Sequence, residues 1–511
     1  ERLAAHATPS RAQADLAQCL SLDRSQVRVI APDVGGAFGA KASLSPEDFA
    51  LALAARHAHC ALSWHSSRSE EFLSGMQGRG SEISGSLRVD AQGNFLALQA
   101  QLEFSLGAWL PYSALMPLRN AARMLPGPYR LSQVQVTSKA KGSHTAAVNI
   151  YRGAGRPEAA LLMETLVDKA ARALQIDPVK LRLRNLLAAS DLPHTTPSGE
   201  LLDSGDYGRA LTSACDTLGY EAARQSQALR RQAGEVVGIG VAMYVEPCGQ
   251  GWEAARVSLQ ADGRITVASG SPAQGQGHAT SFASIAFEVL SPHLPCKLED
   301  IEVLLGDTEV CPEGIGALAS RSMAIGGSAI VQACQQLVGR LLAGEPAPIT
   351  VDAQFTAKEA WSYGCVIACV AIDRDTGELA IERIVWADDA GSIISPALAH
   401  GQLIGGLAQG LGQAMMECIR YDAQGQLLTG SLMDYAVPRA LDLPEDIDIV
   451  SMQTPSPNNL LGAKGVGEAG CIGVPAALMN AARDALSPWG EQDLSFPLGA
   501  EQLWRCMTKA P

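Results

Sequence analysis

Hydrophobic residues along this chain follow two alternating periods, one typical of strands and one typical of helices. Apolar residues alternate with polar ones in 26–31 and on both sides of a turn predicted at 90–94, which indicates strands. Helical spacing begins at Pro46, and it fills the segment 155–178 behind Pro157, where a proline in the first turn is favourable. Strands and helices are interleaved, so the sequence predicts an α+β fold of mixed α/β character.

A polar segment at 190–207 divides the chain into two parts. It is rich in Ser, Pro, Asp and Gly, a composition typical of a linker. A second unit with the same interleaving of strands and helices begins near residue 236. We therefore expect two domains, 1–205 and 206–511. The length of 511 residues and the hydrophobic content of 47% are sufficient for several cores.

The composition argues against several classes of protein. The net charge is −14 and there is no long basic run, so we expect no nucleic-acid binding, which needs clustered Lys and Arg. The sequence has no uninterrupted apolar run long enough for a membrane span, and the first residues carry charges where a signal peptide has an apolar core. Twelve scattered cysteines without a CxxC pair favour a reducing, cytoplasmic environment, with export alongside a partner subunit as the alternative.

Glycine-rich loops are the most unusual feature of the sequence. Glycine lets the backbone approach a ligand closely, and N–H groups in such loops can hold phosphate. One such loop alone is usually a turn, and none of these matches a dinucleotide or P-loop motif. Together they suggest a large cofactor held at several points by backbone. The loops are VGGAFGAK (34–41), IYRGAGRPE (150–158), AQGQGHAT (273–280), GIGALASRS (314–322), AKGVGEAG (463–470) and, more weakly, GQLIGG (401–406).

Glu468 is a single carboxylate among these glycines. Its glycine neighbours indicate either an ordinary turn with a solvated glutamate or clearance for a large group that approaches the carboxylate. Burial with few hydrogen bonds would raise the pKa of Glu468 and suit it to general-base catalysis, and Lys464 would oppose that shift if its side chain pointed inward. Both interpretations of the turn stay open at this point.

Other polar candidates lie in the remaining loops. Tyr151 and Arg152 precede a predicted helix and either face a site or form a surface pair. The amide of Gln276 can donate to an oxo or phosphate oxygen. His278 is expected to be a structural hydrogen-bonding residue, because no second ligand stands at metal-binding spacing.

In this order, the loops resemble the molybdenum-binding large subunit of the xanthine dehydrogenase/aldehyde oxidase family of molybdenum hydroxylases, over about residues 7–490. The resemblance implies two elongated cofactor-binding domains with a Mo-pyranopterin between them, commonly the molybdopterin cytosine dinucleotide in bacteria. It implies oxidative hydroxylation of an aldehyde or aromatic N-heterocycle with water as the oxygen source. Electrons would pass to [2Fe–2S] clusters on an iron–sulfur subunit and then to FAD or another electron-transfer subunit.

The same resemblance assigns roles to individual residues. It implies that Glu468 is the base that deprotonates a hydroxyl ligand of molybdenum, with Phe38 as a wall and Tyr151 and Arg152 as the aromatic–arginine pair of the active site. No protein side chain is expected to bind the metal, because the dithiolene of the cofactor holds it. The cofactor-binding residues implied are Gly36, Phe38, Gly39, Arg152, Gly275, Gln276, Gly277, Ala319, Ser320, Gln402, Lys464, Gly465, Val466, Gly467 and Glu468.

Three positions depart from patterns within the family. Ala7 stands where a Gln often hydrogen-bonds a molybdenum ligand, which predicts a weaker activity or a different group in that role. Ala42 replaces a glutamate of the purine oxidisers, and Gly153 replaces the copper-binding cysteine of the carbon-monoxide oxidisers. Xanthine and a Mo–Cu site are therefore disfavoured, and an aldehyde or aromatic N-heterocycle remains.

Subunits of this family also carry further residues, including a small hammerhead domain, before the position that matches residue 1. We expect either a fragment or a subunit split between two chains, in which a second chain supplies the N-terminal part. The alternative function is a degenerate, non-catalytic member that serves as a structural or assembly subunit. A nucleotide-binding protein of another type is disfavoured by the absence of a standard phosphate motif.

Overall fold

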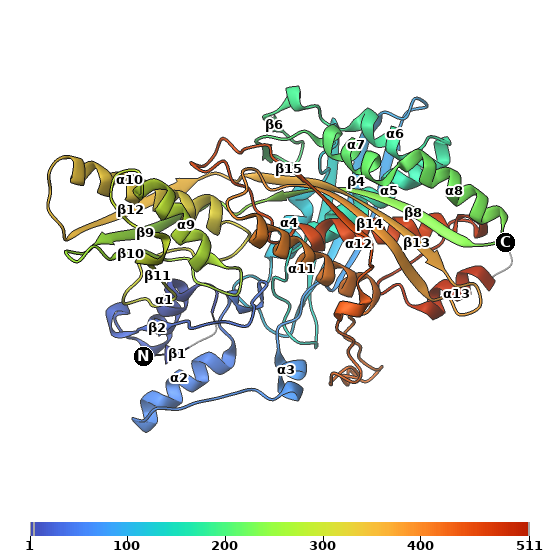
Figure 1. Cartoon of the computed structure of the whole chain (residues 1–511). Helices are drawn as coiled ribbons and strands as arrows, with labels where there is room; N and C mark the ends of the chain where they lie inside the picture. The colour runs from blue at the N-terminus through green and yellow to red at the C-terminus, as the bar shows by residue number, and fades with distance from the viewer. Residues whose placement is uncertain (1, 4–5, 509–511) are drawn as a thin grey trace.

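The computed structural model describes residues 2–3 and 6–508 and shows an elongated molecule (Figure 1). Two four-stranded sheets follow each other along its length, and the first elements of the chain lie beneath the smaller end. Helices and strands are interleaved along the chain, which confirms the predicted α+β fold. No helix within the described residues combines the length and apolar character needed to cross a membrane.

The larger core surrounds a sheet with the strand order β15-β14-β13-β8. β13 is antiparallel to both of its neighbours, whereas β14 and β15 are parallel. The strands are β8 (Val236–Pro247), β13 (Trp361–Ile372), β14 (Leu379–Asp389) and β15 (Ile447–Met452). The covering helices are α5 (Arg156–Leu174), α6 (Pro178–Asn185), α7 (Tyr207–Leu218), α8 (Tyr220–Gln232), α11 (Pro396–Met415), α12 (Ala469–Ala485) and α13 (Ala500–Thr508).

β8 is buried at every position, because helices cover both faces of its sheet. Alternate side chains point to opposite faces of a strand. Val241 and Met243 pack into the core that contains α5 and α7, whereas Ala242 and Tyr244 pack into the core that contains α11 and α12. The end of β8 is therefore a rigid position from which a side chain can be held inside the protein.

The second sheet has the order β11-β10-β9-β12 and carries two helices on one face (Figure 1). Its own core is formed by apolar residues of the sheet and of these helices. The elements are β9 (Gly251–Leu259), β10 (Ile265–Ser269), β11 (Ile301–Leu305), β12 (Ile349–Ala357), α9 (His278–Leu290) and α10 (Ser328–Leu342).

A three-stranded sheet, β3-β4-β5, packs against α4 and α5, and the remaining elements are short. The predicted turn at 90–94 joins β3 to β4, and the helix predicted behind Pro46 is α2, where the Ser45 hydroxyl accepts from the Asp48 N–H at 3.4 Å. The elements are β1 (Arg2–Leu3), β2 (Val29–Ile30), β3 (Ser81–Val89), β4 (Phe95–Gly107), β5 (Gln133–Gly142), β6 (His194–Thr195), β7 (Leu201–Leu202), α1 (Pro9–Leu20), α2 (Pro46–Ala58), α3 (Arg68–Ser74) and α4 (Met116–Met124).

Two local expectations differ from the structure. The strand expected at 26–31 is reduced to β2, because Arg24–Gln26 forms a turn of 3₁₀-helix. The segment 190–207 is not an open linker: it contains the β6–β7 hairpin, and Asp203 is buried. The Asp203 carboxylate accepts hydrogen bonds from the Trp361 N–H at 3.1 Å and the Ser456 hydroxyl at 2.6 Å, so this segment is fixed to the larger core.

α11 and α12 cross at glycines, and this crossing places the end of the loop 463–470. A Cβ atom added to Gly470 would lie 2.2 Å from the carbonyl carbon of Gly406, and one added to Gly410 would lie 2.5 Å from the carbonyl oxygen of Gly470. Only glycine permits so close an approach of two helix backbones. The first turn of α12, which follows Glu468, is therefore held against α11.

Candidate cofactor-binding and active site

Five of the glycine-rich loops and the start of α11 meet around a cavity of about 960 Å³. Of the cofactor-binding residues expected from the sequence, Gly277 is outside the lining and its Cβ position faces Leu398. The cavity is lined by the other expected residues, namely Gly36, Phe38, Gly39, Tyr151, Arg152, Gly275, Gln276, Ala319, Ser320, Gln402, Lys464, Gly465, Val466, Gly467 and Glu468.

Non-glycine residues with left-handed backbone gather at this cavity. Phe38, Ala154, Ala319 and Ser320 have φ angles of 49°, 38°, 49° and 53°. This conformation is unfavourable for residues with a Cβ atom, and it is found preferentially where function or packing demands it. The loops that form the cavity therefore hold local strain that the surrounding structure maintains.

The glycines of the 463–470 loop make room for the protein itself. A Cβ atom on Gly465 would lie 2.3 Å from the Cβ atom of Ser320, and one on Gly467 would lie 2.8 Å from the Ser320 hydroxyl oxygen. The side-chain positions left empty by these two glycines therefore face Ser320, and the space is used by the protein and not by a ligand. Their absence of side chains allows this loop to pack on the loop that carries Ser320.

Glu468 is the residue on which three of the loops converge. It is the residue immediately before α12, and its side chain is 13% exposed, which contradicts the interpretation as a solvated turn. One carboxylate oxygen accepts from the Gly153 N–H at 3.0 Å, and the other accepts from Arg156 at 2.9 Å and from the Ser320 hydroxyl at 3.3 Å. The expectation of few hydrogen bonds is therefore also wrong, because these donors orient the carboxylate at the edge of the cavity.

Arg152 fastens the loop of Gly467 to α11. Its guanidinium donates to the Gly467 carbonyl, to the Gln409 side chain at 2.9 Å, and to the Gln402 carbonyl at 3.0 Å and side-chain oxygen at 3.3 Å. The same guanidinium lies 5.3 Å from the centre of the Phe38 ring. Phe38 is 45% exposed although it is a large apolar residue, so its ring forms an open wall of the cavity.

Tyr151 and Gln276 are less available than the sequence suggests. Arg79 lies 4.7 Å over the Tyr151 ring, and burial raises the pKa of Tyr151 well above its usual value. The Gln276 amide nitrogen lies within hydrogen-bond distance of the Pro272 carbonyl (3.2 Å) and of His278 Nδ1 (3.1 Å), so it stabilises its own loop. Burial lowers the pKa of His278 to about 4, so the imidazole is neutral and structural at pH 7.

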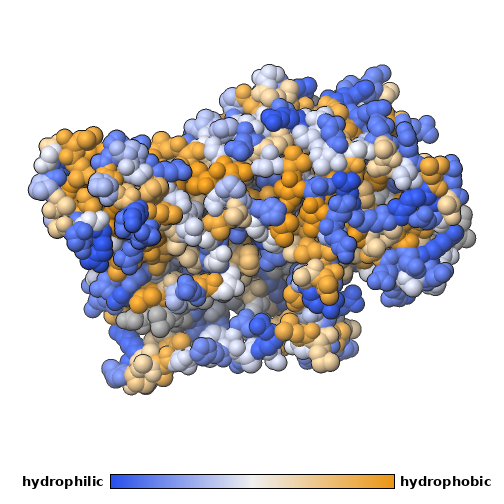
Figure 2. Space-filling model, viewed as in Figure 1, coloured by the Kyte–Doolittle hydropathy of each residue, from blue (hydrophilic) through white to orange (hydrophobic). Residues whose placement is uncertain are grey.

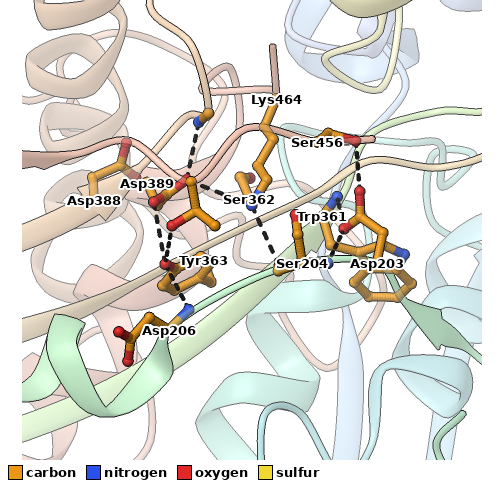
Figure 3. A network of polar contacts seen from close by, with 12 residues as sticks. Asp203, Ser204, Asp206, Trp361, Ser362, Tyr363, Asp388, Asp389, Ser456 and Lys464 are labelled. Atoms are coloured by element: carbon orange, nitrogen blue, oxygen red, sulfur yellow. Dashed lines mark hydrogen bonds and ion pairs between the residues drawn. The ribbon is translucent and has the colours of Figure 1, made fainter. Parts of the chain in front are cut away.

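Lys464 points into the protein, toward Asp389 and Ser204 (Figure 3). Its side chain is completely buried, its ammonium lies 3.5 Å from Asp389, and it donates to the Ser204 carbonyl at 3.3 Å. The ammonium also lies 5.0 Å over the ring of Tyr363, whose hydroxyl donates to Asp389 at 3.1 Å. The Lys464 side chain fixes this loop to the ends of β13 and β14, and residue 464 also borders the cavity, so its expected contact with the cofactor stays a prediction.

Two charged residues of the site were missed by sequence reasoning. Arg156 lies inside the GRPE part of the second loop, where an arginine in the first turn of a predicted helix is indistinguishable from a solvent-exposed one. Glu246 is the single acid in the otherwise uncharged strand β8, and that isolation was an available signal. Within residues 6–508, no group of three or more His, Cys, Asp or Glu side chains is arranged to hold a metal ion.

The cavity is large enough for a cofactor, is lined by the backbone of several glycine-rich loops and is bordered by one oriented carboxylate. Models of the molybdopterin cofactor-binding domain match residues 3–186, 213–347 and 346–444. The chain therefore belongs to the molybdenum-binding large subunits of the molybdenum hydroxylase family, as the order of the loops indicates. Its class is that of the molybdenum-dependent oxidoreductases.

Known proteins agree with this assignment. The chain is 28% identical to the nicotine 6-hydroxylase large subunit of Paenarthrobacter nicotinovorans, over 95% of this chain and 67% of that protein. It is 28% identical to the carbon monoxide dehydrogenase large chain of Hydrogenophaga pseudoflava, over 95% of this chain and 68% of that one. Quinoline 2-oxidoreductase from Pseudomonas putida 86 has the same fold, with a TM-score of 0.93 and 28% identity over 100% of this chain and 72% of that chain.

The residues at the cavity fit a molybdopterin cofactor. At Gly275, whose φ is +95°, an added Cβ would find only the Val34 carbonyl oxygen, at 3.9 Å, so this backbone borders open space. α9 begins three residues later, and the free N–H groups of a helix N-terminus favour phosphate. A cavity of about 960 Å³ is at the upper end of the usual range for large ligands and cofactors.

Proposed function

We propose that this chain is the catalytic large subunit of a molybdenum hydroxylase that oxidises an aldehyde or an aromatic N-heterocycle. The observation that carries the proposal is the Glu468 carboxylate, held at the cavity edge by Gly153, Arg156 and Ser320. Relatives named for nicotine and quinoline support the heterocycle class. Ala42 and Gly153 at their loop positions support a substrate other than a purine or carbon monoxide.

When bound, the Mo-pyranopterin supplies the redox centre at which the substrate is oxidised and two electrons are collected. Glu468 accepts the proton that the reaction releases, and the Arg156 and Ser320 donors keep its carboxylate directed at the cavity. Phe38 offers its exposed ring as a wall for a planar substrate, and Arg152 keeps Phe38 and the Gly467 carbonyl in place. Backbone at Gly36, Gly39, Gly275, Gly465 and Gly467 holds the cofactor, with Gln276, Ala319, Val466 and Gln402 beside it.

The roles of Tyr151, Gly277 and Lys464 are indirect in this proposal. The Tyr151 carbonyl accepts from Arg79 at 3.1 Å, so the residue anchors the loop of Arg152. Gly277 precedes α9 and permits the turn that brings Gly275 to the cavity. Lys464 acts through Asp389 and Ser204, by fixing the loop that carries Glu468.

Residue 7 lies beside the first glycine-rich loop, and as an alanine it has no side-chain amide. Ala7 is buried with Ala37 and Ala42 in a small apolar cluster, and its N–H donates to the Lys41 carbonyl at 2.9 Å. The Ala7 carbonyl accepts from the Ala317 N–H at 3.0 Å. The backbone of residue 7 thus still joins two cavity loops, while its side chain leaves any contact with the cofactor to neighbouring groups.

Partner chains complete the proposed enzyme. Several relatives are named as the large subunit or large chain of an enzyme, or as one subunit of a complex, and we propose an iron–sulfur subunit and an FAD or other electron-transfer subunit for this chain. A second hollow of about 2020 Å³ lies beside α2 and α3, and Figure 2 shows the lower side of the molecule hollowed. It is lined by the exposed apolar residues Leu62, Trp64, Leu432 and Val437, which supports a further polypeptide at this face.

The cytosine dinucleotide form of the cofactor and the domains 1–205 and 206–511 belong to the same proposal. The matched ranges 3–186 and 213–444 lie on either side of the proposed boundary. The chain spans about two thirds of the length of the curated relatives. We propose that a second chain or a further segment supplies the remaining part of the subunit.

One experiment tests the function on the purified complex. We expect stoichiometric molybdenum and a releasable pterin nucleotide, and Glu468→Gln is expected to abolish substrate-driven reduction of the iron–sulfur centres without loss of molybdenum. Glu313→Gln is the matched control, because Glu313 lines the same cavity but is exposed and paired with Arg24. A complex without molybdenum would instead identify a non-catalytic assembly subunit, and undiminished reduction in Glu468→Gln would remove Glu468 from the mechanism.

A further inference from the structure

A second carboxyl group, Glu246, is buried next to the Glu468 site. It is the penultimate residue of β8, it is completely buried, and neither of its carboxyl oxygens has a hydrogen-bond partner within residues 6–508. The next residue, Pro247, accepts from Arg156 at 3.0 Å through its carbonyl. The guanidinium that holds Glu468 is therefore also fastened to the strand end that carries Glu246.

The charges around Glu246 do not provide it with a cation of its own. Arg156 uses one terminal nitrogen for Glu468 and the other for the Pro247 carbonyl, and the Ser320 hydroxyl donates to Glu468. The Asp388 carboxyl accepts from Tyr244, and burial raises its pKa to about 7. The titratable and charged groups that face Glu246 from the surrounding elements are Glu468, Arg156, Asp388, Tyr244 and Cys248.

An ionised carboxylate is costly at such a position. Burying a charge without hydrogen bonds or a counter-ion is strongly unfavourable, and a buried acid responds by keeping its proton. Burial first, and then the negative charge of Glu468, raise the pKa of Glu246 to about 8, against the opposing effects of Arg156 and Ser320. Two carboxyl groups beside one guanidinium are thus divided into one anion and one neutral acid.

We propose that Glu246 is a positioning residue that carries a proton at neutral pH, so that Glu468 is the only carboxylate that pairs with the Arg156 guanidinium among the described residues. Ionisation of Glu246 places a second anion next to Arg156, which weakens the hold of the guanidinium on Glu468 and repels the Glu468 carboxylate. The positioning role of this proton rests on the proposed function of Glu468 as a base. The protonation of Glu246 itself does not depend on that function.

Infrared spectroscopy of the intact complex tests the proton directly. We expect the wild-type complex at pH 7.5, where Asp388 with its pKa of about 7 is mostly ionised, to show the C=O band of a protonated, weakly hydrogen-bonded carboxyl group, and this band should disappear as the pH rises through about 8. Glu246→Gln should lack the band at every pH, while the exposed control Glu313→Gln should retain it. Absence of a band that titrates near pH 8 in wild type, or survival of that band in Glu246→Gln, overturns the proposal.

The positioning role is tested by the pH profile of substrate-driven reduction. The wild-type rate should decline above about pH 8, and Glu246→Gln, which mimics the neutral acid, should retain its molybdenum and lose that alkaline decline. An unchanged alkaline decline in the variant, with the band lost, would refute the role of Glu246. Failure of the proposed function is distinguishable, because it appears as undiminished reduction in Glu468→Gln while the Glu246 band is unaffected.

Discussion

Replacing Gly410 by alanine is expected to destabilise the protein, whereas the same change at Gly401 in the same helix should stabilise it. A Cβ atom at position 410 would meet the Gly470 carbonyl oxygen at 2.5 Å and the Val474 Cβ at 3.1 Å. Nothing lies within 4 Å of the corresponding atom at Gly401. The two variants therefore share the chemical change and differ in what the new methyl group meets.

The magnitude follows from this difference. Alanine is favoured over glycine in a helix interior by about 1 kcal/mol, and both variants gain that amount. At position 410 the Gly470 carbonyl must retreat by roughly 0.9 Å, from 2.5 Å to the 3.4 Å of ordinary contact, and overpacking of this kind costs about 1–3 kcal/mol. The free energies of unfolding of the two variants should therefore differ by about 1–3 kcal/mol.

Chemical denaturation measures this difference. The fluorescence of Trp386 is a suitable probe, because this residue is completely buried in the core that contains α11 and α12. Gly410→Ala should unfold at a lower denaturant concentration than wild type, and Gly401→Ala at a higher one. Equal shifts of the two midpoints would show that helix propensity alone acts here and that the close crossing of α11 and α12 is wrong.

Three further changes test the surroundings of the site. Lys464→Met leaves Asp389 as a buried charge without its ion pair and should cost about 3–5 kcal/mol in the free energy of unfolding; an effect below 1 kcal/mol would contradict the buried pair. Between about pH 4.5 and about pH 8, the folded protein holds a proton on Glu246 that the unfolded chain releases. As the pH rises through this range, the free energy of unfolding of wild type should therefore fall by about 1.4 kcal/mol per pH unit relative to that of Glu246→Gln. Parallel stability curves would refute this proton linkage. Ala319→Gly should raise the thermal midpoint, because Ala319 has a left-handed backbone with φ of 49° that glycine adopts without penalty. A lowered midpoint would show that packing of the Ala319 methyl group stabilises the protein more than its backbone conformation destabilises it.

The sequence was sufficient to predict the fold class and the loops that meet at the cavity. The glycine-rich segments are local signals, and their order along the chain carries the family resemblance. Side-chain direction was not predictable in the same way. Lys464 turns toward Asp389 because residues 204, 363 and 389 lie beside it only in the folded chain.

Glu246 and Gly465 illustrate the same limit. Glu246 is a polar residue at the end of an otherwise uncharged strand, and only the three-dimensional arrangement shows that it lies near Glu468 and Arg156. The sequence around Gly465 suggests space for a ligand. In the structure, the lack of a side chain at Gly465 allows its backbone to pack closely on Ser320, a residue distant in sequence. Contacts between distant segments decide these roles, and periodicity or spacing contains no information about them.

The three hydrogen bonds of Glu468 have a consequence for motion during turnover. The carboxylate that is proposed to take up a proton also joins the beginning of α5 to the beginning of α12 through Arg156. A charge-assisted hydrogen bond is roughly twice as strong as a neutral one, so protonation of Glu468 weakens this junction at the moment when product is formed. In the proposed reaction, each turnover would therefore loosen the contact between the start of α5 and the start of α12, and release of the proton to solvent would restore it before the next substrate binds.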